Sequence, residues 1–350
     1  MSERILVVAP SWVGDAILSE PLIARLAERF AGAAIDVLAP PWCAPVYTRM
    51  RGVRHVIDNP FGHGRFDLRG RRALARSLRA ETGERSYDRA YVLPNSWKSA
   101  LIPWLAGVPT RVGYRGEGRW GLLTDARTLD RKGVPRLVDR FVALADEKRA
   151  PASQRSPAPV LIADERNRRS AAAAMDLDLE KPVAILCPGA EFGPAKRWPA
   201  EHFSALAQRF LRDGLQVWLI GSPRDRPEAS AVIAAAGSAG SSIRDLAGRT
   251  DLGTAIDLLA GASVVVSNDS GLMHAAAAVG APVVALFGSS SPEYTPPLSP
   301  RATIARIEIS CSPCFQRECP LGHFRCMREL EPVTVYHLAR VGDGRAAQPE

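Results

Sequence analysis

The sequence has no long hydrophobic run, although 46% of its residues are hydrophobic. Its longest apolar stretches have the length of a β-strand, and none approaches the roughly 20 residues that span a bilayer. The opening residues, MSERILVVAP, also lack the extended apolar region and the small-residue cleavage site of a signal peptide. We therefore expect a soluble chain located in the cytoplasm.

The sequence also lacks the features of a nucleic-acid-binding protein. Aromatic residues make up only 7% of the chain, and they do not alternate with a basic stripe or form a known recognition module. Cations are in excess, with 45 Lys and Arg against 37 Asp and Glu. Arginine dominates and suits bidentate recognition of phosphate or carboxylate. The excess fits an anionic ligand other than nucleic acid, and it equally fits a basic surface that only aids solubility.

Cysteine is scarce along most of the chain. Cys43 and Cys187 stand alone in apolar surroundings, as buried thiols of a reducing compartment do. The other four lie with His323 in the segment CSPCFQRECPLGHFRC, at positions Cys311, Cys314, Cys319 and Cys326. Five such ligands are enough for a tetrahedral zinc site, but their spacing matches no standard zinc finger. Buried thiols or a redox-sensitive pair are the alternative, and we predict no metal site.

The length of 350 residues predicts two domains, because a single domain has roughly 150. A segment without periodicity, KRAPASQRSPAPV, separates them between Lys148 and Val160. We predict one domain at residues 1–150 and a second at 151–350. Strand and helix patterns alternate in both, which predicts α/β folds with parallel sheets covered on both faces. Ligands of such sheets bind beyond the carboxyl ends of the strands, so we expect the active site in the cleft between the domains.

Hydrophobic periodicity places the individual elements of the two domains. Strands are predicted at residues 4–9, 34–39, 53–58, 88–93, 183–187, 216–221, 263–267 and 282–288. Helices are predicted at residues 15–30, 68–81, 199–212, 226–236, 254–260 and 271–279.

The strongest local motif is ASVVVSNDSGLMHAAAAVGAPVVALFG, at residues 262–288. A buried strand ends at Asn268-Asp269-Ser270-Gly271, and a helix of small residues follows. Gly271 lets a ligand approach the backbone, and the helix amides behind it form an anion site suited to a diphosphate. Asp269 and Ser270 are also residue types that simply cap helices. A cap alone does not explain Gly271 and His274.

A second motif, CPGAEFGPAKRWP at residues 187–199, follows another predicted strand. Lys196 and Arg197 precede a helix, and a lysine here can neutralise a leaving diphosphate. A solvated Lys-Arg pair is the simpler alternative. Two further strand-end loops complete the predicted donor site: GSPRDRPE, from Gly221, faces the nucleoside, and residues 288–291 close the pocket.

In the first domain, Asp15 follows Gly14 where the first strand gives way to a helix. A carboxylate there is a candidate general base, since transfer to a hydroxyl group needs a proton acceptor within hydrogen-bond reach. Helix capping is the alternative role of Asp15. Basic residues in the same domain provide a candidate acceptor surface: Arg65, Arg69, Lys98, Arg111, Arg115 and Arg119.

A GxGxxG match at Gly116, Gly118 and Gly121 follows no buried strand, so we do not predict a dinucleotide site.

Four motifs together resemble the lipopolysaccharide heptosyltransferases: SWVGDAILSEP, PGAEFGPAKRWP, VSNDSGLMHAAAA and CSPCFQRECPLGHFRCM. The resemblance covers nearly the whole chain, and the last motif is similar to the heptosyltransferase II group. It implies the GT-B fold, two Rossmann-like domains whose parallel sheets face across a central cleft. It also implies inverting transfer of heptose from ADP-L-glycero-D-manno-heptose onto the first heptose of the lipopolysaccharide inner core, with no metal or other cofactor required.

Matched position by position, the resemblance assigns the general base to Asp15 and the phosphate-binding lysine to Lys196. The acidic residue for the donor ribose is either Asp225 or Glu228. The predicted donor-binding set is Gly14, Lys196, Asp225, Asp269, Ser270, Gly271, Leu272 and His274. The implied partners are ADP-heptose and a lipopolysaccharide inner-core glycolipid, with peripheral contact at the cytoplasmic face of the inner membrane. Two alternatives remain, a heptosyltransferase I acting on Kdo2-lipid A and a non-catalytic, zinc-stabilised binding protein.

Overall fold

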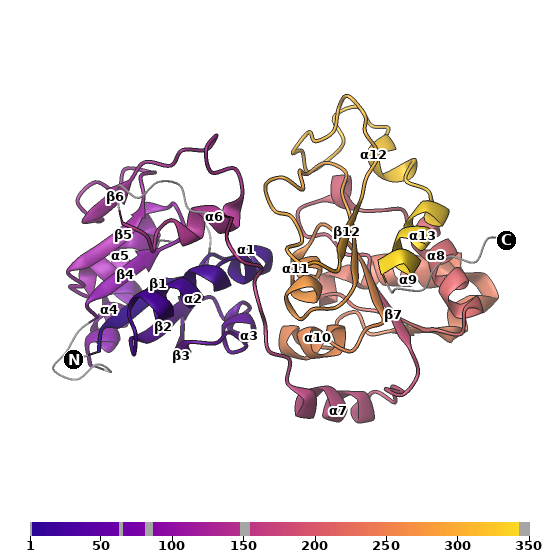
Figure 1. Ribbon diagram of the computed structural model, residues 1–350, viewed down its shortest axis with the longest axis horizontal. Coiled ribbons are helices and arrows are strands. Elements are labelled where there is room, and N and C mark those ends of the chain that lie inside the picture. Colours follow the sequence, from indigo (N-terminus) through magenta and orange to yellow (C-terminus); the bar gives the residue numbers. More distant parts are fainter. Residues whose placement is uncertain (1, 63–65, 81–86, 148–154, 343–350) are drawn as a thin grey trace. The chain divides into compact units, whose positions relative to one another are not determined.

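The computed structural model describes residues 2–62, 66–80, 87–147 and 155–342. The chain divides into two compact units, Met1–Pro159 and Val160–Glu350 (Figure 1). The predicted domain boundary, between residues 150 and 151, lies outside the described residues.

Unit 1 contains a twisted parallel sheet whose strand order is β3-β2-β1-β4-β5-β6. In register, Val7 of β1 lies beside Val37 of β2 on one side and Tyr91 of β4 on the other. Every strand pair in this sheet is parallel, so the predicted α/β fold is confirmed here. The strands are β1 (Arg4–Val8), β2 (Ala34–Ala39), β3 (Val53–Asp58), β4 (Arg89–Val92), β5 (Thr110–Tyr114) and β6 (Asp125–Arg127).

The helix predicted at residues 15–30 is two helices, α1 (Val13–Leu18) and α2 (Glu20–Arg29). The prediction of one helix was wrong because Pro21 has no N–H to donate to the carbonyl of Ile17, and its ring crowds that turn. Ser19 occupies the junction, where its hydroxyl donates to the carbonyl of Ala16 at 2.6 Å. The break separates the first turn, which carries Asp15, from the long amphipathic helix α2.

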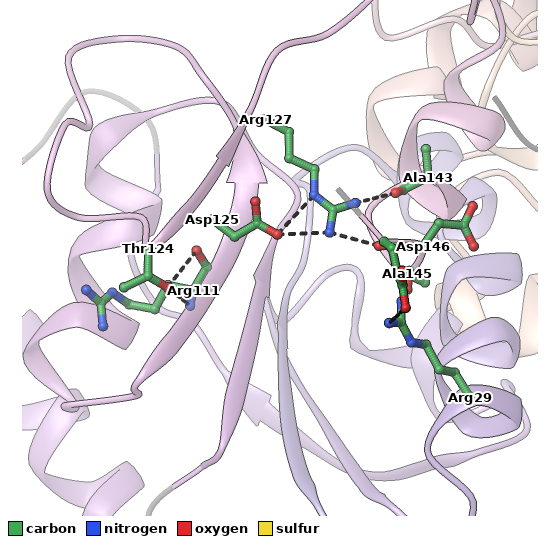
Figure 2. Close-up of polar contacts among 9 residues, drawn as sticks. Arg29, Arg111, Thr124, Asp125, Arg127, Ala143, Ala145 and Asp146 are labelled. Atoms are coloured by element: carbon green, nitrogen blue, oxygen red, sulfur yellow. Dashed lines mark hydrogen bonds and ion pairs between the residues drawn. The ribbon is translucent and has the colours of Figure 1, made fainter. Parts of the chain in front are cut away.

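The remaining helices of unit 1 cover the sheet. Helices α4 and α5 pack on each other over one face, where Leu6, Val8 and Val92 are buried. At the far edge of the sheet, Arg127 of β6 donates to the carbonyls of Ala143 and Asp146 at 2.5 and 2.9 Å (Figure 2). These bonds tie the edge strand to the segment that follows α6. The helices are α3 (Ala44–Tyr47), α4 (Leu68–Ala80), α5 (Trp97–Leu105) and α6 (Leu137–Val142).

Unit 2 repeats the same topology, with strand order β12-β11-β10-β7-β8-β9 and parallel pairing throughout. Both sheets therefore have the doubly wound order of a Rossmann fold, in which the first strand of each unit lies at the centre. The two central strands, β7 and β10, are buried along their whole length. The strands are β7 (Val183–Cys187), β8 (Gln216–Leu219), β9 (Ile243–Asp245), β10 (Val264–Asn268), β11 (Val283–Leu286) and β12 (Ala302–Ala305).

The helices of unit 2 form two groups, and those within each group contact one another (Figure 1). Helices α7, α10 and α11 form one group, and α8, α9 and α13 form the other. The second group packs on a core around Phe203, Phe210 and Met327. The helices are α7 (Glu165–Ala174), α8 (Ala200–Arg212), α9 (Arg226–Ala235), α10 (Leu252–Leu259), α11 (Gly271–Ala278), α12 (Arg325–Arg328) and α13 (Pro332–Gly342), with 3-10 turns at Pro194–Lys196, Pro223–Asp225 and Gly237–Ser242.

Four strands were not predicted from the sequence: β5, β6, β9 and β12. Strands β6, β9 and β12 are edge strands of three or four residues, and β5 lies next to an edge. Residues so near an edge are partly exposed, so they lack the continuous apolar run that marks a buried strand. Among the described helices, none combines the length and the apolar character needed to cross a membrane.

Candidate active site

The strand order of unit 2 reverses between β7 and β10, which are hydrogen-bonded neighbours. The helices that follow two such strands lie on opposite faces of the sheet, so their connecting loops separate and leave a crevice at the strand ends. The loop after β7, Pro188–Trp198, carries Lys196. The loop after β10 carries Asp269 and Ser270. The two strongest motifs of the sequence thus meet at the expected ligand-binding position of the sheet.

Lys196 and Asp269 form an ion pair across this crevice. The ammonium group of Lys196 lies 2.5 Å from Asp269 Oδ2, and the side chains are 16% and 5% exposed. The hydroxyl of Ser290, from the loop after β11, donates to the same oxygen at 2.5 Å. Phe192 lies beneath the ammonium, with its ring centroid 5.0 Å away. The lysine is therefore held in place and is not the solvated side chain of the alternative interpretation.

Helix α11 begins at this ion pair. Ser270 occupies the N-cap position, but its side chain makes no capping hydrogen bond. Its hydroxyl lies instead 3.2 Å from the hydroxyl of Ser267, and the carboxylate of Asp269 contacts Lys196 and Ser290. The first-turn amides of α11 thus receive no side-chain cap, and the helix dipole adds to their preference for an anion. The capping interpretation of Asp269 and Ser270 was wrong.

His274 lies one turn into α11 and is 5% exposed. Burial lowers its pKa to about 4; Asp269 acts in the opposite direction, and Lys196 lowers the pKa further. The imidazole is therefore neutral near pH 7, where it can donate or accept a hydrogen bond but adds no positive charge. Leu272 and Gly271, in the first turn, are half-buried beside the crevice.

The structure separates the two acidic residues considered for the ribose. Asp225 lies directly over Gly189 and Gly221, because a Cβ atom at either glycine would come within 2.2 or 2.8 Å of its side chain. Its Oδ2 accepts two bonds from Ser222, from the amide and the hydroxyl, both at 2.8 Å. Glu228 pairs with Arg197 instead. Asp225 is thus the carboxylate at the ends of β7 and β8.

Asp15 lies in unit 1, in the first turn of α1, immediately after Gly14. The N-cap residue of this helix is Trp12, so Asp15 does not occupy the N-cap position. Asp15 is half-buried at the start of the helix that follows the central strand β1. Its charge contributes to the raised pKa of Tyr47, although burial of that phenol is the larger cause.

The predicted acceptor surface divides into exposed and structural cations. Arg69 and Arg115 are exposed, and Lys98 is half-buried at the start of α5. Arg111, in contrast, donates to the carbonyls of Val108 and Leu122, and Figure 2 shows its backbone beside Thr124. Arg65 lies outside the described residues.

The Arg119 side chain is 3% exposed, and its hydrogen bonds are to other groups of unit 1. It donates to the carbonyl of Pro94 at 2.6 Å and to Asn95 Oδ1 at 3.1 Å. Burial lowers the pKa of its guanidinium to about 10, which leaves it charged at neutral pH. This arginine fixes the loop after β4. The exposed residues Arg69 and Arg115 are the better candidates for contact with the acceptor.

The cysteine-rich segment packs on the loop that carries Lys196. The amide of Ala195 donates to the carbonyl of Arg317 at 3.0 Å. The thiol sulfur of Cys319 accepts the amide N–H of Phe324 at 3.4 Å, and this bond lowers the pKa of that thiol. Within the described ranges, no group of three or more His, Cys, Asp or Glu side chains is arranged to hold a metal ion. All six cysteines are free thiols.

Comparison with known proteins identifies relatives of this chain. Residues 71–325 match the family described as glycosyltransferase family 9 (heptosyltransferase). Lipopolysaccharide heptosyltransferase 2 of Salmonella typhimurium is 44% identical over 338 residues, which cover 95% of this chain and 96% of that protein. Lipopolysaccharide heptosyltransferase 1 of Pseudomonas aeruginosa is 26% identical over 320 residues, 90% of this chain and 87% of that protein.

A solved structure resembles the whole chain. The structure of Escherichia coli ADP-heptose lipopolysaccharide heptosyltransferase II has a TM-score of 0.86 and 41% sequence identity, and the match covers 98% of this chain and 99% of that one. The similarity includes both units, so it extends over the donor-site loops of unit 2 and the Asp15 region of unit 1.

Proposed function

The chain belongs to glycosyltransferase family 9, the heptosyltransferases, and on this basis we propose which reaction it catalyses and how. The reaction is transfer of L-glycero-D-manno-heptose from ADP-heptose onto the first heptose of the lipopolysaccharide inner core. The fold is GT-B, as the topology of both sheets and the similarity to heptosyltransferase II indicate. The observation that carries the proposal is the Lys196–Asp269 ion pair at the start of α11.

The donor diphosphate binds at this ion pair. The ammonium of Lys196 and the amides of the first turn of α11 supply positive charge where the β-phosphate departs, which stabilises the leaving ADP. Since Asp269 holds Lys196 at 2.5 Å, the cation is oriented before the donor arrives. Neutral His274 and the backbone at Gly271 add hydrogen-bonding groups to the same anion. These groups give the charge stabilisation that other sugar transferases obtain from a metal, so the reaction requires no bound metal.

Asp225 binds the ribose of the donor. Its carboxylate lies over Gly189 and Gly221, in the loops after β7 and β8, and a nucleoside at a doubly wound sheet occupies this place. A carboxylate with two acceptor oxygens suits the two hydroxyls of a ribose. Glu228, held by Arg197, remains part of the supporting structure.

The chemical step is a single displacement with inversion at the anomeric carbon. The acceptor hydroxyl gives its proton to the carboxylate of Asp15, and its oxygen forms the new bond to C1 of the heptose. The bond from C1 to the β-phosphate oxygen breaks as this happens, and the electron pair leaves with ADP. Asp15 lies at the start of the helix after the central strand of unit 1, whereas the residues of the donor site belong to unit 2.

The acceptor is an anionic glycolipid of the inner membrane, and unit 1 carries cations suited to it. Arg69, Arg72 and Arg76 of α4 are exposed and share one side of the helix, because they lie three and four residues apart. We name these three residues the α4 arginine stripe. The stripe gives the enzyme peripheral contact with the cytoplasmic face of the membrane by attraction to anionic headgroups.

The alternatives make different predictions. A non-catalytic zinc-stabilised binding protein does not agree with membership of a glycosyltransferase family. A heptosyltransferase 1 would use Kdo2-lipid A, but the chain is more similar to a heptosyltransferase 2, at 44% against 26% identity. The deciding experiment measures ADP release from ADP-heptose with each acceptor. Release that depends on heptosyl-Kdo2-lipid A supports the proposal, and release with Kdo2-lipid A alone contradicts it.

A further inference from the structure

Asn268 is the last residue of β10, and its side chain is completely buried. The side-chain NH2 group donates to the carbonyl of Pro188 at 2.7 Å, and the side-chain oxygen accepts the amide N–H of Trp198 at 3.1 Å. The two partners fix the orientation of the amide, because a carbonyl can only accept and a backbone N–H can only donate. Both hydrogen-bonding ends of Asn268 are therefore used inside the protein.

The two partners of Asn268 are the two ends of one loop. Pro188 is the first residue after β7, and Trp198 directly precedes Pro199, the N-cap residue of α8. The loop between them, Pro188–Trp198, carries Lys196. A single side chain thus holds both ends of the loop that positions the phosphate-binding cation.

The other end of Asn268 is linked to the anion side of the site. Its backbone continues directly into Asp269, whose carboxylate holds Lys196. Its carbonyl also accepts the hydroxyl of Ser267 at 2.8 Å. Trp198 is anchored independently, since its indole N–H donates to the carbonyl of Leu330 at 2.8 Å. The two side-chain bonds of Asn268 join both ends of the lysine loop to β10, the strand that leads directly into Asp269.

We propose that Asn268 is a positioning residue for the donor diphosphate: its amide locks the Lys196 loop in register with Asp269 and the start of α11. This inference rests on the proposed function, because it names the residue that assembles the donor site. Asn268 does not touch the reacting atoms. Without its amide, the loop keeps its bonds to Leu330 and Arg317 but loses the two bonds that set it against β10, so Lys196 is held less precisely beside Asp269.

The test compares ADP binding by three variants and the wild type. Asn268→Ala removes both bonds and leaves the carbonyl of Pro188 and the amide of Trp198 without that partner. Asn268→Asp keeps the size and the oxygen that faces Trp198 but replaces the donor with an acceptor. Asn167→Ala is the matched control, because Asn167 also bridges two side chains of unit 2, Thr254 and Asp257, at 3.3 and 2.7 Å. It lies on α7 and not in the donor loops.

Calorimetry with ADP alone, below the unfolding temperature of each variant, measures the effect. We expect Asn268→Ala to weaken ADP binding about 10-fold or more, because the diphosphate loses the oriented ammonium of Lys196 and a hydrogen bond between charged groups contributes about this much. Asn167→Ala should stay within about twofold of wild type, since unpaired groups on α7 do not reach the donor loops. In Asn268→Asp, burial raises the pKa of the introduced carboxyl group, and its protonated form can again donate to Pro188, so its defect relative to wild type should shrink as the pH falls toward 5. The defect of Asn268→Ala should not change with pH.

Three results would overturn the inference: ADP affinity of Asn268→Ala within about twofold of wild type, an equal loss in Asn167→Ala, or no pH rescue of Asn268→Asp. The proposed function is tested separately by heptose transfer in the wild type. If the wild type binds ADP but transfers no heptose, the function fails while the role of Asn268 is still measured. If the wild type binds no ADP, both fail.

Discussion

Buried His274 makes the free energy of unfolding depend on pH, and replacing this one side chain should remove its contribution. Its burial lowers the imidazole pKa from 6.5 to about 4 in the folded state. An unfolded chain exposes the same imidazole to water, where its pKa returns to roughly 6.5. Between these two values the unfolded state binds a proton that the folded state does not. Protonation therefore favours unfolding over this range.

The size of the effect follows from the difference between the two pKa values. Each pKa unit is worth about 1.4 kcal/mol, so the full difference corresponds to about 3 kcal/mol. The contribution of neutral His274 to the free energy of unfolding is complete above about pH 6.5, and it decreases as the pH falls to about 4. At pH 5 the folded state should already have lost about 2 kcal/mol relative to pH 7 through this residue.

His274→Gln replaces the imidazole with a side chain that cannot be protonated in this range. We expect its free energy of unfolding to be less dependent on pH than that of the wild type, by about 2 kcal/mol between pH 7 and pH 5. Urea unfolding at a series of pH values measures the difference between the two proteins, in which the contributions of other groups cancel. His337→Gln, at an exposed position on α13, is the control and should follow the wild type. Parallel pH profiles for wild type and His274→Gln would show that His274 does not cause the loss of stability at low pH.

Three further predictions concern the donor site and the membrane surface. Lys196→Gln should lower kcat about 100-fold or more, because it removes the cation that stabilises departing ADP, and steady-state kinetics with saturating donor test this. A kcat within threefold of wild type would contradict the role of Lys196, given that losing one such group costs roughly 100-fold. Ser290→Ala should lower kcat by about threefold to tenfold, with unchanged acceptor KM, because Asp269 loses one of its two partners but keeps the ion pair. Replacing the α4 arginine stripe with glutamine should weaken binding to vesicles that contain anionic lipid and make it insensitive to salt; unchanged binding in a sedimentation assay would show that the stripe does not face the membrane.

The sequence predicted the central part of each sheet because those strands are buried on both faces. Strand β10 reads as a continuous apolar run, and Gly271 with the alanines after it marks the helix start. The edge strands β6, β9 and β12 were missed because strands of three or four mostly exposed or half-buried residues carry no such signal. The break at Ser19 was also missed, although Pro21 is visible in the sequence, since the apolar periodicity continues across it.

The site residues divide in the same way. Lys196, Asp225 and Asp269 could be proposed from the sequence because they lie in the loops after the buried strands β7, β8 and β10, and such loops lie at one edge of a parallel sheet. The roles of Arg111 and Asn268 could not be predicted, because each depends on backbone groups that folding brings close. Asn268 lies 80 residues from Pro188 in the chain. No local pattern distinguishes an asparagine that joins two loops from one that merely ends a strand.

In the proposed reaction, Asp15 removes the acceptor proton while unit 2 holds ADP-heptose. The most direct test is acceptor-dependent ADP release by wild type and Asp15→Asn, with donor affinity measured in parallel. The asparagine is nearly the same size but cannot take up the proton. We predict that the variant binds ADP-heptose as tightly as wild type and releases ADP at least about 100-fold more slowly with heptosyl-Kdo2-lipid A. Release at the wild-type rate by Asp15→Asn would show that Asp15 is not the general base.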